Sequence, residues 1–187
     1  MNKTLIAVLA VFTFFGGLLL LGIGTYISAA NYGNRTEKQI EATWENNQNI
    51  LAQYSNRIAE MAQIPAMQRN DFSKVYADAM GGRYGKDGSK AVVQWIREQN
   101  PQLNTAVYTN IQTSMEAGRK DFEVAQTTLI DQKRAYETEL GTVWRGFWLN
   151  LAGYPKIDLS KFKAITNDYA ADAFTTGKEN GIKLNQE

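Results

Sequence analysis

The chain has 187 residues, with 20 basic and 19 acidic side chains and neither cysteine nor histidine. This near-neutral balance disfavours nucleic-acid binding, which needs a basic surface to displace phosphate counterions. Without cysteine and histidine, the chain cannot form disulfides, thiolate nucleophiles, Ser-His pairs or most zinc sites. An enzyme with this composition could use only carboxylate groups or bound hard cations. We therefore expect no enzymatic activity, no metal and no cofactor.

Residues 4–30 contain no charged side chain. A helix of roughly 20 apolar residues crosses the hydrocarbon core of a bilayer, so we predict a transmembrane anchor over residues 1–30 that meets lipid through residues 4–30. A cleaved signal peptide is the alternative, because Lys3 precedes the run and small residues (Ser28, Ala29, Ala30) end it. The hydrophobic region of such a peptide has only about 7–15 residues, which favours the anchor.

The orientation of this single span depends on few charges. Lys3 precedes the span, and Arg35 and Lys38 are the first cations after it, so the basic residues are nearly balanced. A long C-terminal domain can cross regardless of its charge. We expect the N-terminus inside and the domain outside the cytoplasm.

After a short polar connection at residues 31–35, a helix is predicted from Thr36 to Ile64, with Pro65 ending it. The positions on one face of this helix, all apolar except Asn47, follow the 4-3 spacing of a packed bundle or coiled coil. They are Ile40, Trp44, Asn47, Leu51, Tyr54, Ile58 and Met61. Asn47 can be a buried residue that sets the register or a position near the edge of the bundle; we favour the edge.

Two short helices are predicted next. The first begins at Asn70 or Asp71 and ends at Met80, and the second runs from Ser89 to near Asn100. Between them, residues 81–88 hold four glycines. This segment lacks the spacing of a phosphate-binding or calcium-binding loop, so we interpret it as a plain turn.

The longest pattern starts at Pro101 and continues through Phe147. It predicts one helix of about 70 Å, because each residue adds 1.5 Å. Its seam consists of Leu103, Val107, Ile111, Met115, Gly118, Phe122, Ala125, Leu129, Gln132, Tyr136, Leu140, Val143 and Phe147. A last helix is predicted at residues 160–175, followed by a polar tail at 177–187. The fold class is all-α.

Aromatic residues gather where the long helix ends. Trp144, Phe147 and Trp148 lie within five residues, and Tyr154 follows. They can close the core at the end of the bundle, or part of the cluster can be an exposed patch. These four residues are our candidate partner-binding site. If the first helix leads away from the bilayer and the next two return, the cluster lies distal from the membrane.

Several short stretches of the chain resemble the LemA family of bacterial membrane-anchored helical proteins, over most of residues 31–165. These stretches are Tyr32-Gly33-Asn34, Ile40-Glu41-Ala42-Thr43-Trp44, Ile64-Pro65, Asn100-Pro101-Gln102-Leu103, Arg134-Ala135-Tyr136-Glu137 and Gly153-Tyr154-Pro155. The chain departs from the family pattern at Asn56-Arg57, where the family has a double arginine before its Pro-Asn-Leu, and at Glu137, where it has Asn. It resembles a divergent member, of bacterial or phage origin.

The resemblance implies a single-span protein with an elongated antiparallel bundle of three to four helices over residues 31–176. It implies neither enzymatic activity nor an agreed substrate. The main functional hypothesis is a non-enzymatic scaffold or protein-interaction module with an unknown protein partner. The alternatives are an extracytoplasmic ligand-sensing domain and, third, a carboxylate-based cell-wall hydrolase. The same helix seams can also serve a homo-oligomer.

Overall fold

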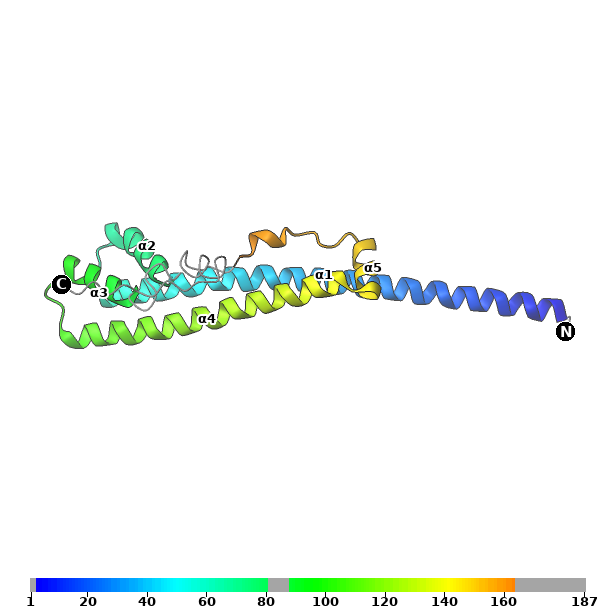
Figure 1. The fold of residues 1–187 in the computed structure, drawn as a ribbon, viewed down its shortest axis with the longest axis horizontal. Helices are drawn as coiled ribbons and strands as arrows, with labels where there is room; N and C mark the ends of the chain where they lie inside the picture. Colours follow the sequence, from blue (N-terminus) through cyan, green and yellow to red (C-terminus); the bar gives the residue numbers. More distant parts are fainter. Residues whose placement is uncertain (1–2, 81–87, 164–187) are drawn as a thin grey trace, which may run out of the picture. The chain divides into compact units, whose positions relative to one another are not determined.

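The computed structural model describes residues 3–80 and 88–163 (Figure 1). These residues form helices joined by short connections, with no strand among them, and the all-α prediction is confirmed. The elements are α1 (Lys3–Met61), η1 (Ala66–Gln68), α2 (Arg69–Met80), α3 (Gly88–Gln99), α4 (Thr105–Gly141), α5 (Val143–Leu151) and η3 (Leu159–Lys161).

The chain divides into two compact units. The first unit combines Met1–Thr43 with Leu129–Phe162, and the second combines Trp44–Thr128 with Lys163–Glu187. One boundary falls inside α1 and another inside α4, so each of these helices contributes one part to each unit.

The second unit has the larger hydrophobic core. Helices α2 and α3 pack there with the later part of α1 and the earlier part of α4. Its largest fully buried side chains are Ile58, Phe72, Tyr76, Val92, Ile96, Ile111 and Met115. The hydroxyl of Tyr54 donates a 2.5 Å hydrogen bond to Asp121, and this bond raises the pKa of Tyr54. Asn47 is buried, so the predicted position at the edge of the bundle is wrong.

Helix α1 ends three residues earlier than predicted, and Gln63 shows why. Its φ of 55° is left-handed. The N–H of Ile64 bonds the carbonyl of Ala59 at 2.9 Å, and the N–H of Gln63 bonds that of Glu60 at 3.1 Å. This pattern is a Schellman motif, which satisfies the last carbonyls of a helix. Pro65 follows and disfavours helical geometry at Ile64.

Residues 31–35 are helical, so the predicted polar connection after the apolar run is wrong. The stretch contains no proline. Its one glycine, Gly33, is buried against the ring of Tyr154, and tertiary packing there outweighs the weak helix propensity of glycine. One helix therefore runs from the apolar run into the part of α1 that follows.

The predicted long helix is two helices. α4 begins at Thr105, because the side chain of Asn104 accepts a 2.9 Å hydrogen bond from the N–H of Ala106 and caps the first turn. It ends at Gly141 and has 37 residues, a length of about 55 Å. The seam prediction holds from Leu103 to Leu140, where every member is buried or half-buried.

The short helices lie close to their predicted positions. α2 begins at Arg69, one residue before Asn70, the earlier of the two predicted starts, and ends at Met80 as predicted, while α3 covers Gly88–Gln99. Residues 81–87 and 164–187 lie outside the described residues, and with them the glycine-rich turn, most of the predicted last helix and the polar tail. Within the described part, that last helix begins only as the three-residue turn η3.

Candidate interaction surface

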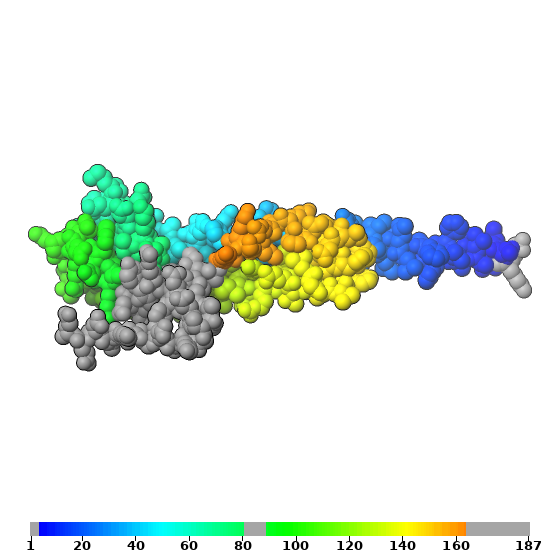
Figure 2. Space-filling view, turned by 45° about the horizontal axis from the view of Figure 1, so that its top comes forward, coloured from blue at the N-terminus to red at the C-terminus, as the bar shows by residue number. Residues whose placement is uncertain are grey.

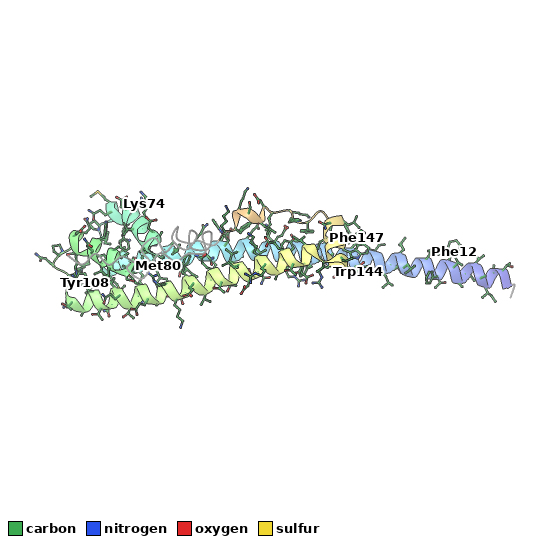
Figure 3. The ribbon with its side chains drawn as sticks, in the orientation of Figure 1. Phe12, Lys74, Met80, Tyr108, Trp144 and Phe147 are labelled. Atoms are coloured by element: carbon green, nitrogen blue, oxygen red, sulfur yellow. The ribbon has the colours of Figure 1, made fainter. Side chains whose placement is uncertain are left out.

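The first part of α1 is apolar and uncovered. Every residue from Thr4 to Leu21 is exposed. No other segment covers this blue end of α1 on the face that Figure 2 shows, and the side chain of Phe12 projects from the helix (Figure 3). By length and composition this helix can cross a membrane. This finding fits the predicted anchor. Among the described residues, α1 is the only helix that meets these criteria.

Thr142 creates α5. Its backbone is extended, and its hydroxyl oxygen accepts a 3.2 Å hydrogen bond from the N–H of Gly146. The same hydroxyl donates to the carbonyl of Glu139 at 2.8 Å. Thr142 thus ends α4 and caps α5 at once. Gly146 then lies so close to the carbonyl of Leu140 that no larger residue fits without a shift.

A second Schellman motif ends α5. Gly153 adopts a φ of 78°, the N–H of Tyr154 bonds the carbonyl of Leu149 at 3.0 Å, and the N–H of Gly153 bonds that of Asn150 at 3.0 Å. Leu149 and Tyr154 are both buried, as the hydrophobic contact of this motif requires. The motif aims the Tyr154 ring at α1.

Small residues of α1 receive α5 and the turn after it. A Cβ at Gly33 would lie 2.7 Å from Cγ of Tyr154, and a Cβ at Gly22 would lie 3.8 Å from Cη2 of Trp148. Ala29 is buried between these two contacts with Leu149 and Tyr154. The first unit therefore has a small core in which α5 docks on residues 22–33 of α1.

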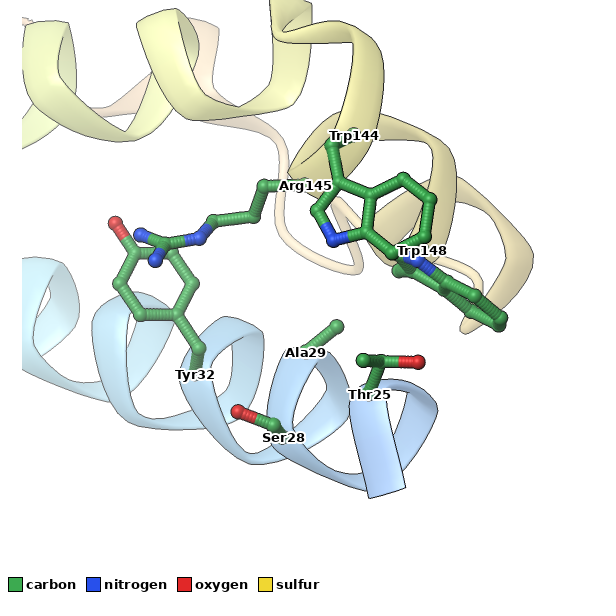
Figure 4. Close-up of a pocket in the computed structure, with 7 residues that line it drawn as sticks. All are labelled: Thr25, Ser28, Ala29, Tyr32, Trp144, Arg145 and Trp148. Carbon is green, nitrogen blue, oxygen red and sulfur yellow. The ribbon is translucent and has the colours of Figure 1, made fainter. Parts of the chain in front are cut away.

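A recess of about 190 Å³ opens beside this contact (Figure 4). Its lining residues are Thr25, Ser28, Ala29, Tyr32, Trp144, Arg145 and Trp148. The guanidinium of Arg145 lies 4.8 Å from the centre of the Tyr32 ring and pairs with Glu139 at 3.1 Å. Ligand pockets usually measure about 300–1,000 Å³, so the recess is too small for a typical metabolite.

The four predicted site residues separate into exposed and buried ones. Trp144 is 67% exposed and Phe147 57% exposed, whereas Trp148 is half-buried and Tyr154 is 5% exposed. The ring of Trp148 stands edge-on to both Trp144 (5.7 Å) and Phe147 (5.3 Å). Trp144, Phe147 and Trp148 therefore belong to one surface, and Tyr154 supports it from inside.

Sequence reasoning missed the rest of this surface. Val143 is 93% exposed and Leu151 59% exposed, so four apolar residues of α5 face outward with Trp148 at their edge. We name Val143, Trp144, Phe147 and Leu151 the outer face of α5.

The predicted distal position of the cluster is wrong, because Trp148 lies against Gly22 inside the apolar run.

A buried carboxylate anchors the same unit. Oε1 of Glu37 accepts hydrogen bonds from the hydroxyl of Tyr136 (2.9 Å) and from the N–H of Lys156 (2.7 Å). Burial and then this hydrogen bond raise the pKa of Tyr136 well above its usual value. The predicted seam marks Glu37 when it is continued toward the N-terminus, since Gly33, Glu37, Ile40 and Trp44 follow the same 4-3 spacing.

The second unit has a recess of about 200 Å³ lined by Trp44, Asn47, Gln48, Leu51, Phe122, Gln126 and Lys163. Neither this recess nor the one beside α5 is lined by an aspartate or glutamate. Among the described residues, no group of three or more carboxylates could hold a metal ion.

Comparison with family models, with curated proteins and with solved structures finds no match to this chain. The resemblance to the LemA family stays a prediction from the sequence.

Proposed function

We propose that the chain is a single-pass membrane protein whose helical part is a non-enzymatic scaffold or interaction module of LemA-like type. One observation carries the proposal. Helix α1 combines an exposed apolar run with a continuation that carries buried positions such as Glu37, Ile40 and Ile58. In water, 18 consecutive exposed residues of this kind would be a severe liability, whereas in lipid they are solvated.

An antiparallel arrangement of α1 and α4 is part of the proposal. Within the first unit Thr43 bonds Gln132 and Glu37 bonds Tyr136, so residue numbers rise along one helix as they fall along the other. Within the second unit Tyr54 bonds Asp121. Long paired helices offer extended surfaces for partners and fit a scaffold better than a catalyst.

The orientation that we propose keeps the N-terminus inside and the helical part outside. Because the chain lacks cysteine, a single introduced cysteine reports its location without background. In intact bacterial cells, a membrane-impermeant maleimide is expected to label Met67→Cys, whose position is 91% exposed. It should label Asn2→Cys only after the membrane is opened. The reverse labelling would overturn the orientation.

Extraction tests the membrane anchor itself. The full chain should stay in the membrane fraction at alkaline pH, and Phe12→Arg combined with Leu19→Arg should release it. Each arginine at the centre of a span costs roughly 3 kcal/mol on insertion scales. Met67→Arg is the matched control and should stay bound. Release of the unmodified chain, or a mature chain that lacks residues 1–30, would contradict the anchor.

Chemical cross-linking of the full chain followed by mass measurement addresses the interaction module. Discrete cross-linked multimers would identify a second copy as a partner, and a monomer would direct the search to other proteins. Turnover of a cell-wall substrate that is lost on substitution of a carboxylate would contradict the non-enzymatic proposal.

A further inference from the structure

We infer that α5 is a second membrane contact, whose outer face lies in the interfacial layer of the same bilayer that α1 crosses. The inference rests on the proposed single-pass anchor. It names lipid as the occupant of the surface formed by Val143, Trp144, Phe147 and Leu151.

The outer face is continuous. With 100° between successive residues of an α-helix, Val143, Phe147, Leu151 and Trp144 fall within an arc of about 100°. Leu149 lies on the other side of α5 and is fully buried against α1. Helix α5 is thus apolar on both sides, and only its inner side is covered by protein among the described residues.

The position of α5 along α1 matches the edge of a bilayer. If the hydrocarbon core begins near Leu5, about 20 residues bring its far boundary to about Gly24. Trp148 packs on α1 beside Gly22 and Arg145 contacts α1 at Tyr32, about 15 Å further along the axis. The two contacts lie on either side of the expected boundary.

The polarity of α5 changes in the matching direction. Trp148 lies toward the apolar run, whereas Arg145 lies over Tyr32 on the side away from it (Figure 4). Tryptophan and tyrosine rings prefer the interfacial layer, and apolar residues of in-plane helices enter lipid by about 5–10 Å. The order of Trp148 and Arg145 along α1 therefore matches the change from apolar to polar across the interfacial layer.

Continuity with exposed residues of α1 favours lipid over a protein partner. Ile23, Tyr26 and Ile27 are exposed in the segment on which α5 docks, and they extend the uncovered run that begins at Thr4. A protein that covered the outer face would sit at the same level of α1 as these residues. Lipid covers both surfaces without further contacts.

Spin labels in the full chain test the inference. Single cysteines at Val143, Phe12 and Met67 carry a nitroxide, and the protein is reconstituted in vesicles of phosphatidylethanolamine and phosphatidylglycerol. The measured quantity is the ratio of collision rates with oxygen, which concentrates in lipid, and with a water-soluble nickel chelate. All three positions are exposed, so the labels disturb no packing.

The expected ratio is several-fold higher at Val143 than at Met67, and highest at Phe12. A ratio at Val143 equal to that at Met67, with a lipid value at Phe12, would overturn the inference and leave the anchor intact. A water value at Phe12 would overturn both. Spin-spin broadening confined to Val143 would assign the outer face to a second copy instead of lipid.

A variant pair separates lipid contact from folding. Trp144→Ser with Phe147→Ser should lower the ratio at Val143 to the value at Met67, while helix content stays unchanged. The control, Met67→Ser with Val124→Ser, removes two exposed apolar side chains of the second unit and should leave the ratio unchanged. An unchanged ratio in the first variant would contradict a role of these rings in membrane contact.

Discussion

The hydroxyl of Tyr136 donates a 2.9 Å hydrogen bond to Glu37, and both side chains are buried. The same carboxylate oxygen accepts the N–H of Lys156 at 2.7 Å. One carboxylate therefore joins α1, α4 and the segment after α5. Because buried polar groups are costly when unpaired, this cluster fixes the register of the three segments.

Removal of the Glu37 carboxylate should destabilise the protein. Glu37→Ala leaves the Tyr136 hydroxyl and the Lys156 N–H without an acceptor, and we expect a loss of about 2–3 kcal/mol in the free energy of unfolding. Glu37→Gln keeps an acceptor oxygen and should lose less. The measurement is urea unfolding of the full chain in detergent, followed by circular dichroism.

The control for Glu37 is Glu45→Ala, since Glu45 is exposed on the same helix. This change should alter stability by less than about 0.5 kcal/mol. Equal losses at both positions would show that the buried cluster contributes nothing specific.

The raised pKa of Tyr136 predicts a loss of stability at alkaline pH. A phenol whose pKa is higher in the folded than in the unfolded state holds more protons when folded above pH 10. Its contribution is complete below about pH 10 and decreases as the pH rises further. Unfolding of the wild type should therefore become easier above pH 10.

Tyr136→Phe isolates this contribution, because the other tyrosines titrate in both proteins. Its free energy of unfolding should be lower than that of the wild type at pH 8, and the difference should shrink above pH 10. A constant difference across this range, measured by urea unfolding at each pH, would contradict the assignment.

Gly33 should tolerate no side chain. A methyl group there would meet the Tyr154 ring at 2.7 Å, so Gly33→Ala should displace the turn after α5. We expect faster hydrogen exchange at the N–H of Tyr154, which bonds Leu149. Gly24→Ala is the control, since nothing lies within 4 Å of its Cβ position. Unchanged exchange in the Gly33 variant would show that α5 does not depend on this contact.

Gln63 should be improved by glycine. A residue with a side chain pays roughly 1 kcal/mol for left-handed geometry, and glycine does not. We expect Gln63→Gly to raise the free energy of unfolding by about 1 kcal/mol. Gln53→Gly, at an exposed position inside α1, should lower it by a similar amount. A decrease in both variants would contradict the strain at Gln63.

The helical fold could be predicted because periodicity reports burial directly. The seam from Leu103 to Leu140 was correct, yet the same spacing continued to Val143 and Phe147, which are exposed. The difference is Thr142, whose extended backbone turns the chain. Threonine is common inside helices as well as at caps, so the sequence carried no clear signal for this break.

The candidate surface was only partly predictable. The density of aromatic residues pointed to Trp144 and Phe147, but Trp148 and Tyr154 pack on α1 beside small residues, Gly22 inside the apolar run and Gly33 just after it. Gly22 and Gly33 fit a membrane helix as well as a docking site, and only the positions of Trp148 and Tyr154 distinguish the two. The role of these glycines follows from packing between residues far apart in the sequence, which the local sequence pattern does not contain.

Helix α1 has no joint between the apolar run and Glu37. A rotation of the apolar half of α1 about its own axis would therefore be transmitted in full to the carboxylate, about 24 Å beyond Leu21. One inserted residue after Asn34 would turn Glu37 by about 100° away from Tyr136 while leaving Gly22 and Gly33 in place. The helical geometry of α1 alone therefore sets the angle between the side chains of the apolar run and the buried carboxylate.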